Sequence, residues 1–194
     1  QGGGLRIDTG NSPGYITGLA MTAIAATKAP DRVHGDTDGD GDVDGDDDGV
    51  ASGPAVGWTY DEILQGLVTY SESVQETSGV AKGGWHYTGA HSGGDNSPCG
   101  YTVLGLRAAE DANTVDAGAP PWVSAFTIVI QQSTKTDLKN WVDYVQHDTT
   151  GGSGYEYAGQ YENLLKTGNL LFEATFEASG DADPALWYQS RVDN

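Results

Sequence analysis

Residues 96–112 read NSPCGYTVLGLRAAEDA, and residues 11–28 read NSPGYITGLAMTAIAATK, which repeats the same theme. Each copy begins with Asn-Ser-Pro, contains a Gly-Tyr pair and continues with leucine, methionine or alanine in a pattern typical of a buried helix. Proline suits the first turn of a helix, where its missing N–H has no partner to lose. Residues 163–178, NLLKTGNLLFEATFEA, form a third and more divergent copy. We therefore predict three short, buried helices.

Longer amphipathic segments follow the first two copies. One covers about 58–77 and the other about 121–147, and the sequence predicts one helix in each. A glycine-rich turn with aromatic residues follows each segment, at 79–87 and at 151–159. The order of short helix, long helix and glycine-aromatic loop predicts an all-α fold, an array of about three helical hairpins.

The two glycine-aromatic turns carry a family resemblance. YSESVQ at 70–75 is followed by GGW at 83–85, and WVDYVQ at 141–146 is followed by GSGY at 152–155. These segments resemble the QW repeats of the prenyltransferase and squalene–hopene cyclase superfamily, over most of the chain outside 32–56. The resemblance implies an α/α toroid, in which inner helices line a cavity and outer helices surround them. A closed toroid of that superfamily uses about twice as many hairpins, so we expect a partial toroid.

The repeat spacing locates an insertion. Gly100 and Gly168 are 68 residues apart, whereas Gly14 and Gly100 are 86 apart, so the first unit is 18 residues longer. The acidic stretch at 32–49 also has 18 residues and lies between the first two predicted helices. We therefore expect a single toroid-like domain over 1–194, with residues 32–49 inserted into a helix–helix connection.

The insertion contains DTDGDGDVDGDD at 36–47, which matches the 12-residue EF-hand calcium loop. Gly41 occupies position 6, where the loop turns sharply, and Val43 occupies position 8, where an apolar side chain anchors the loop. An aspartate in place of glutamate at position 12 resembles the calcium loops of dockerin-type modules. The predicted Ca²⁺ ligands, at positions 1, 3, 5, 7, 9 and 12, are Asp36, Asp38, Asp40, Asp42 through its carbonyl, Asp44 and Asp47.

Two other interpretations of the acidic stretch remain open. A run of like charges is often only a solvated insert. Residues 44–47, Asp-Gly-Asp-Asp, also match the DxDD motif with which class II terpenoid cyclases protonate their substrates. A protonating aspartate needs burial and a raised pKa, and a glycine-rich loop among many other aspartates supplies neither.

Outside the insertion, three weaker candidates for a functional site stand out. His86, His91, Asp95 and Cys99 offer zinc-ligand types, although their spacing makes no tight ligand pair on one helix. The pair Glu156 and Glu162 offers an acid and a base. The third candidate is a set of aromatic residues at the glycine turns, which either pack the turns or bind a sugar. That set consists of Trp58, Tyr60, Trp85, Tyr87, Tyr101, Tyr155, Tyr157 and Tyr161.

Charge and length limit the function. The 28 acidic and 9 basic residues give a net charge of −19, which repels nucleic-acid phosphates and argues against a nucleic-acid partner. No apolar run approaches the roughly 20 residues of a membrane span. The chain starts at Gln1 without a recognisable signal peptide, so we expect an extracellular or cell-surface location with the signal already removed.

The expected function combines the insertion with the partial toroid. Three hairpins leave an apolar helix face at each end of the array, which favours homo-oligomers, as a ring or a filament. We predict a calcium-binding structural or assembly protein rather than an enzyme. The alternatives are an α/α-toroid enzyme, terpenoid-cyclase-like or polysaccharide-active, and a carbohydrate-binding module.

Overall fold

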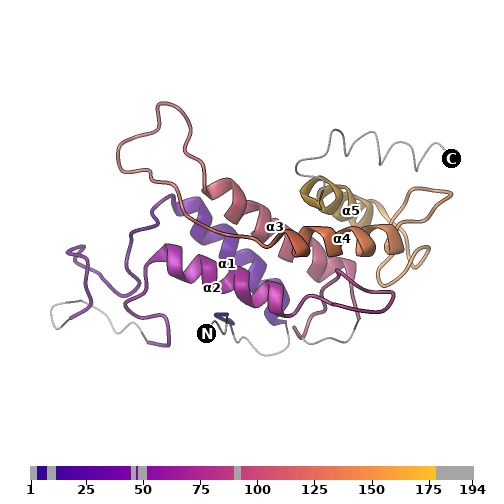
Figure 1. The fold of residues 1–194 in the computed structure, drawn as a ribbon, viewed down its shortest axis with the longest axis horizontal. Helices are drawn as coiled ribbons and strands as arrows, with labels where there is room; N and C mark the ends of the chain where they lie inside the picture. Colours follow the sequence, from indigo (N-terminus) through magenta and orange to yellow (C-terminus); the bar gives the residue numbers. More distant parts are fainter. Residues whose placement is uncertain (1–3, 8–11, 45–46, 48–51, 90–92, 178–194) are drawn as a thin grey trace.

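The computed structural model describes residues 4–7, 12–44, 47, 52–89 and 93–177 (Figure 1). These ranges contain five α-helices and no β-strand, which confirms the all-α class. The helices are α1 (Pro13–Thr27), α2 (Tyr60–Ser73), α3 (Asn96–Ala112), α4 (Gln132–Val145) and α5 (Leu164–Glu177). The sequence from Pro184, PALWYQSRVDN, predicts the start of a further outer helix, and it lies outside the described residues.

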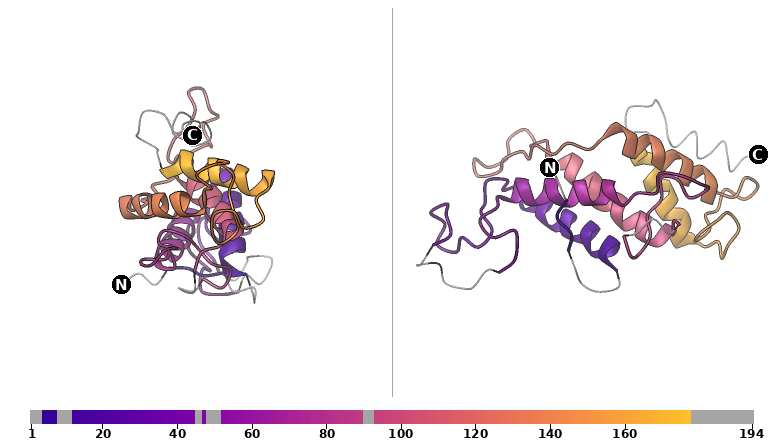
Figure 2. Two further views of the ribbon diagram at one scale, coloured as in Figure 1. Left: turned by 90° about the vertical axis from the view of Figure 1, so that its right-hand side faces the viewer. Right: turned by 60° about the horizontal axis from the view of Figure 1, so that its bottom comes forward.

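The odd-numbered helices form a row in which α3 packs against both α1 and α5. Helix α2 packs against α1 and α3, and α4 packs against α5, as the two views in Figure 2 also indicate. Fully buried leucines from four helices join one core: Leu64, Leu67, Leu106, Leu138 and Leu170. The toroid-like arrangement stays a prediction, because five helices in this order do not define a ring.

The tightest helix contact is between α1 and α3, and two glycines permit it. A Cβ atom on Gly18 would overlap the backbone carbonyl of Tyr101. A Cβ atom on Gly105 would lie 2.6 Å from the carbonyl oxygen of Gly18 and from the Cε of Met21. The repeated glycines in the two Asn-Ser-Pro copies therefore let the two backbones approach closely.

Side chains cap the first turns of α2 and α3. Helix α2 begins with a capping box, in which the Thr59 hydroxyl accepts a hydrogen bond from the Glu62 N–H and the Glu62 carboxylate accepts one from the Thr59 N–H. The Asp95 carboxylate caps α3 by accepting from the Ser97 N–H at 2.8 Å. Helix α2 is shorter than the helix predicted at 58–77. It starts only at Tyr60, after the capping box, and it ends at Ser73.

The prediction of one long helix from 121 to 147 is wrong in its first part. Residues 123–131 are extended, and α4 begins only at Gln132. In this segment Phe126 and Ile128 are buried, whereas Thr127 and Val129 between them are exposed. The burial thus alternates with the period of two that a strand has, and a β-branched run favours this conformation over a helix.

Side chains of α2 satisfy the backbone of this extended segment. Asp61 accepts from the Thr127 N–H at 2.7 Å and from its hydroxyl at 2.8 Å. The Gln65 amide exchanges two hydrogen bonds with the Val129 backbone, at 2.8 and 3.1 Å. The Glu72 carboxylate accepts from the Gln131 N–H at 2.6 Å. These side chains replace the neighbouring strand that an extended backbone normally needs.

The Asn113 side chain holds the other edge of the segment. It accepts from the Ile128 N–H at 2.8 Å and donates to the Ile128 carbonyl at 2.7 Å. Figure 1 shows the segment passing along α2 and α3 before it enters α4. The connection from α3 to α4 is therefore fixed from both sides.

Both glutamines of the QW-like segments are buried and bond to their glycine turns. Gln75 donates to the carbonyls of Gly83 and Thr134, each at 3.0 Å, and so links the end of α2 to the first turn of α4. Gln146 donates to the Gly151 carbonyl at 3.4 Å. The Trp85 indole is 1% exposed and donates to the Ser71 carbonyl at 2.8 Å. The glutamines and the tryptophan therefore stabilise the turns, as the sequence predicts.

Candidate metal centre

The acidic loop leaves the helical body through a short antiparallel pairing. Val33 and Thr59 form an isolated bridge, and His34 exchanges backbone hydrogen bonds of 2.8 and 2.9 Å with Trp58 and Gly57. The Tyr60 N–H donates to the Arg32 carbonyl at 2.8 Å. The first residues of α2 are therefore bonded directly to the base of the loop. Figure 2 shows the loop projecting from the end of the molecule where α1 ends and α2 begins.

Three aspartates converge within the loop. Asp36, which is half-buried, and the exposed Asp38 and Asp40 each offer a carboxylate oxygen, and these oxygens all lie within 4.8 Å of one another. No other group of three possible metal ligands of this kind occurs in the ranges that the structure describes. Calcium binds six to eight oxygens at 2.3–2.6 Å, so three converging carboxylates form part of a possible coordination sphere.

Backbone donors and a glycine turn set the shape of the loop. The two oxygens of Asp36 accept from the N–H groups of Gly39 at 2.6 Å and Gly41 at 3.0 Å. Gly41 has φ +103°, a conformation that a residue with a Cβ rarely adopts. The turn predicted at position 6 of the loop is therefore present, and the Asp36 carboxylate holds it.

Asp47 returns to the start of the loop. Its two carboxylate oxygens accept from the Thr37 N–H at 2.5 Å and from the Asp44 N–H at 2.9 Å. Position 12 thus lies beside position 2 of the same loop. Residues 45–46 lie outside the described ranges. The roles of Asp42, Asp44 and Asp47 as ligands stay predictions.

Electrostatics distinguish Asp42 from Asp47. Repulsion from Asp40, and then from Asp44, raises the pKa of Asp42. Hydrogen bonds from the backbone N–H groups, first that of Thr37, lower the pKa of Asp47. A lowered pKa is the opposite of what a proton donor needs, so Asp47 is poorly suited to protonate a substrate. A divalent cation would relieve the repulsion that Asp42 experiences.

The predicted zinc set is not brought together among the described residues. His91 lies outside them, Asp95 caps α3, and the thiol of Cys99 is fully buried against the backbone of Trp85. Burial, followed by the nearby Glu173 carboxyl, raises the pKa of the Cys99 thiol. A thiol of this kind is a packing residue rather than a ready thiolate ligand.

The two glutamates and the turn aromatics, which the sequence offers as further candidates, differ in burial and in hydrogen bonding. The Glu162 carboxylate accepts from the Thr150 hydroxyl at 2.9 Å, and Glu156 is exposed. Among the turn aromatics, Trp85 is buried, whereas Tyr157 is 49% and Tyr161 77% exposed. The Glu162 carboxylate is therefore bonded within its own loop, and Glu156 is exposed.

Sequence reasoning missed two buried ionisable side chains on α5. Lys166 is 4% exposed, and Glu173 is fully buried with no hydrogen-bond partner for either carboxylate oxygen within the described part of the chain. Burial raises the pKa of Glu173 well above its ordinary value. The spacing in the sequence could have indicated this burial. Lys166 precedes the buried Leu170 by four residues and Glu173 follows it by three, so all three lie on the same face of the helix.

No family model, curated protein or solved structure matches this chain. Among the described helices, none is both long and apolar enough to cross a membrane.

Proposed function

We propose that this protein is a secreted or surface-exposed calcium-binding structural module, in which the loop from Asp36 to Asp47 holds one Ca²⁺ ion. The observation that carries the proposal is the convergence of the Asp36, Asp38 and Asp40 carboxylates, with Asp47 closing the same loop. Hard oxygen donors of this kind favour calcium over softer transition metals. Millimolar calcium, as found outside cells, is the concentration at which an exposed loop fills.

The ion acts on the fold through the base of the loop. His34 and Arg32 on one side bond to Trp58 and Tyr60 on the other, and Tyr60 is the first residue of α2. Calcium binding orders the twelve-residue loop and so restrains the two segments that form this base. We therefore propose that calcium fixes the junction between α1 and α2 and stabilises the native state.

Thermal unfolding tests the calcium proposal. With a dissociation constant of about 10⁻⁴ to 10⁻³ M, about 10 mM calcium stabilises the fold by about 1.4 to 2.7 kcal/mol. For a chain of this length that corresponds to a rise of about 3 to 10 °C in Tm. Asp40→Asn should abolish the rise and Asp116→Asn, at an exposed site outside the loop, should keep it. An equal Tm with calcium and with chelator contradicts the proposal.

We also propose that the helices are part of a toroid-like array that associates with further copies. The packing of α1, α3 and α5 in a row, with α2 and α4 outside it, supports such an array. Exposed apolar side chains on and beside α5 support association: Leu164 is 87% exposed, Leu171 39% and Tyr161 77%. Apolar groups in such number at one place are typical of an interaction surface.

Sedimentation velocity over a range of protein concentrations tests the association independently of calcium binding. The wild-type chain should form larger species as concentration rises. Leu164→Asp together with Leu171→Asp should leave a monomer, because the charges disrupt the apolar surface. Val80→Asp, at a site 68% exposed between α2 and α3, serves as the matched control and should still associate. A wild-type chain that stays monomeric at every concentration refutes the association and leaves the calcium proposal intact.

A further inference from the structure

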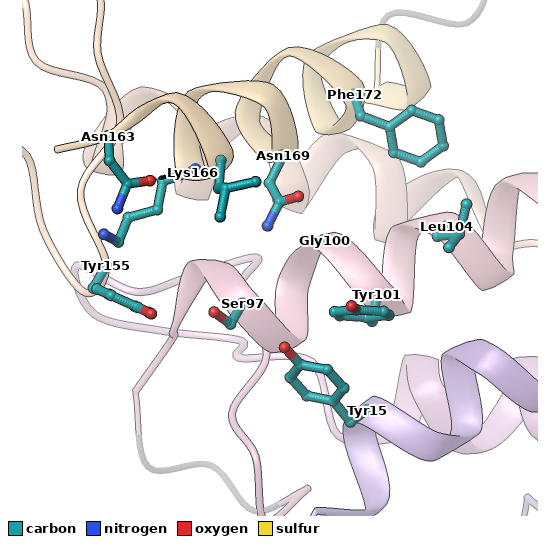
Figure 3. A pocket seen from close by; sticks show the side chains of 11 residues that line it. Tyr15, Ser97, Gly100, Tyr101, Leu104, Tyr155, Asn163, Lys166, Asn169 and Phe172 are labelled. Atoms are coloured by element: carbon teal, nitrogen blue, oxygen red, sulfur yellow. Dashed lines mark hydrogen bonds between the residues drawn. The ribbon is translucent and has the colours of Figure 1, made fainter.

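A cavity of about 500 Å³ opens between α3 and α5, far from the acidic loop. Figure 3 shows its lining side chains, which come from the first turns of α1, the first half of α3 and α5, and the loop before α5. Its volume lies in the range of small-molecule sites. The calcium loop does not contribute to this cavity, whereas Tyr101 and Tyr155 of the predicted aromatic set line it.

One end of the cavity holds a buried cation with which no carboxylate of the described residues forms an ion pair. Lys166 is 4% exposed, and its Nζ donates to the Tyr161 carbonyl at 2.5 Å. The same Nζ lies 3.9 Å from the centre of the Tyr155 ring. No carboxylate of a described residue lies within ion-pair distance of this Nζ. An ammonium group has three N–H donors, and the single carbonyl does not satisfy them all.

The desolvation cost of Lys166 therefore remains only partly compensated. A buried charge normally has a full set of hydrogen bonds and an opposite charge beside it. The Tyr155 ring face offers a weaker electrostatic partner through its quadrupole. Lys166 also acts on Asp95. Burial is the main cause that raises the pKa of Asp95, and the charge of Lys166 is the smallest of the causes that lower it; that carboxylate already caps α3.

Polar groups accompany the cation. Asn163, Asn169 and Ser97 line the same cavity, and Figure 3 shows Asn163 beside Lys166 and Tyr155. The side chain of Asn169 fits only because residue 100 is glycine, since a Cβ there would lie 2.6 Å from the Asn169 Cγ. An ammonium group with an amide beside it, and further amide and hydroxyl groups along the same cavity wall, suit a small oxyanion such as a carboxylate.

The opposite end is apolar and aromatic. Leu104 and Phe172 line it, and beside them the Tyr15 and Tyr101 rings lie tilted by 34° against each other with centroids 4.1 Å apart. Ring faces and aliphatic groups offer surface that a hydrocarbon body or an aromatic ring can cover. The cavity is thus polar and cationic at one end and apolar at the other.

We propose that this cavity binds a small organic monocarboxylic acid, with its carboxylate at Lys166 and its apolar body against Tyr101, Leu104 and Phe172. The net charge of −19 repels polyanions, including acidic polysaccharides and nucleic acids, more strongly than a single carboxylate. The proposal does not depend on calcium binding or on self-association, because it uses neither the loop nor Leu164 and Leu171.

Matched small probes test the charge requirement on the unmodified protein. Phenylacetate and phenylacetamide have nearly the same shape, and only the first carries a carboxylate. In calorimetric titrations, phenylacetate should bind one site about ten- to hundredfold more tightly than the amide. Acetate, which lacks the ring, should bind at least about tenfold more weakly than phenylacetate. Equal affinity for acid and amide, or no binding of phenylacetate at about 10 mM, overturns the proposal.

Two lysine variants locate the site. Lys166→Met keeps most of the aliphatic side chain and should lower the affinity for phenylacetate to that of the amide. Lys139→Met removes a lysine with a 55% exposed side chain on α4, outside the cavity, and should bind as the wild type does. An unchanged affinity in Lys166→Met refutes the assignment. Should that variant fail to fold, the acid and amide comparison on the wild type decides the matter alone.

Discussion

Replacing Glu173 by glutamine should change how stability depends on pH. The Glu173 carboxyl is fully buried on α5, no hydrogen bond from the described residues reaches its oxygens, and burial raises its pKa well above the ordinary value of 4.5. The folded protein therefore holds a proton on Glu173 at pH values where the unfolded chain has released it. Glutamine has almost the same shape and does not titrate.

The sign and slope follow from proton linkage. Below about pH 4.5 both states are protonated, and Glu173 adds no pH dependence. Above that pH the folded state binds up to one proton more than the unfolded state, so the free energy of unfolding falls by up to about 1.4 kcal/mol per pH unit. Glu173→Gln removes this loss. The variant should gain on the wild type by up to about this slope as pH rises above about 5, until the carboxyl of the folded state itself ionises.

Urea unfolding at constant salt, repeated at several pH values, measures the effect. The quantity of interest is the difference in unfolding free energy between Glu173→Gln and the wild type, because any constant cost of the substitution cancels from its slope. Glu156→Gln, the same change at an exposed site, serves as the control for the loss of one carboxyl. A flat difference for Glu173→Gln, or a fall with rising pH, would show that Glu173 is not buried as a neutral acid.

Four further variants test the packing. Gly18→Ala should destabilise by about 1 to 3 kcal/mol because its Cβ overlaps the α3 backbone, whereas Gly168→Ala, in a helix with open space around it, should stabilise by about 0.5 to 1 kcal/mol. Stabilisation by both, in urea unfolding, would disprove the close contact. Asp61→Ala should cost about 1 to 2 kcal/mol because Thr127 loses two hydrogen bonds. Gln75→Ala should cost about 2 to 3 kcal/mol because two buried carbonyls lose their donor, and a neutral effect would refute this role.

The sequence predicts the short helices well because their signals are local. Asn-Ser-Pro followed by a regular apolar pattern marks the starts of α1 and α3, and each begins within two residues of its Asn-Ser-Pro motif. The buried Gln75 and Gln146 also follow from local spacing between a helix end and a glycine turn. In these segments local propensity and tertiary packing favour the same structure.

Residues 123–131 show where local reasoning fails. Their apolar content resembles that of a helix, but their extended conformation depends on Asp61, Gln65 and Glu72 of α2, which lie about 60 residues earlier. The alternation of buried Phe126 and Ile128 with exposed neighbours is the available signal, and it favours an extended chain. Tertiary hydrogen bonds therefore decide between two conformations that the apolar pattern alone does not separate.

The two candidate sites also differ in whether the sequence predicts them. The acidic loop is recognisable because all of its ligands lie within twelve consecutive residues, so spacing along the chain implies proximity in space. The cavity at Lys166 combines residues from three helices and a loop, and no spacing in the sequence brings Tyr15, Tyr101 and Lys166 together. Only the packing of α1, α3 and α5 does so.

Calorimetric titration of the protein with calcium tests the central claim most directly. We predict one site per chain with a dissociation constant of about 10⁻⁴ to 10⁻³ M. Asp36→Asn with Asp40→Asn should abolish the binding, and Asp116→Asn with Glu156→Gln, which makes the same change in charge outside the loop, should preserve it. Binding that survives the first pair, or a wild-type protein that binds no calcium at millimolar concentration, would contradict the assignment of the loop.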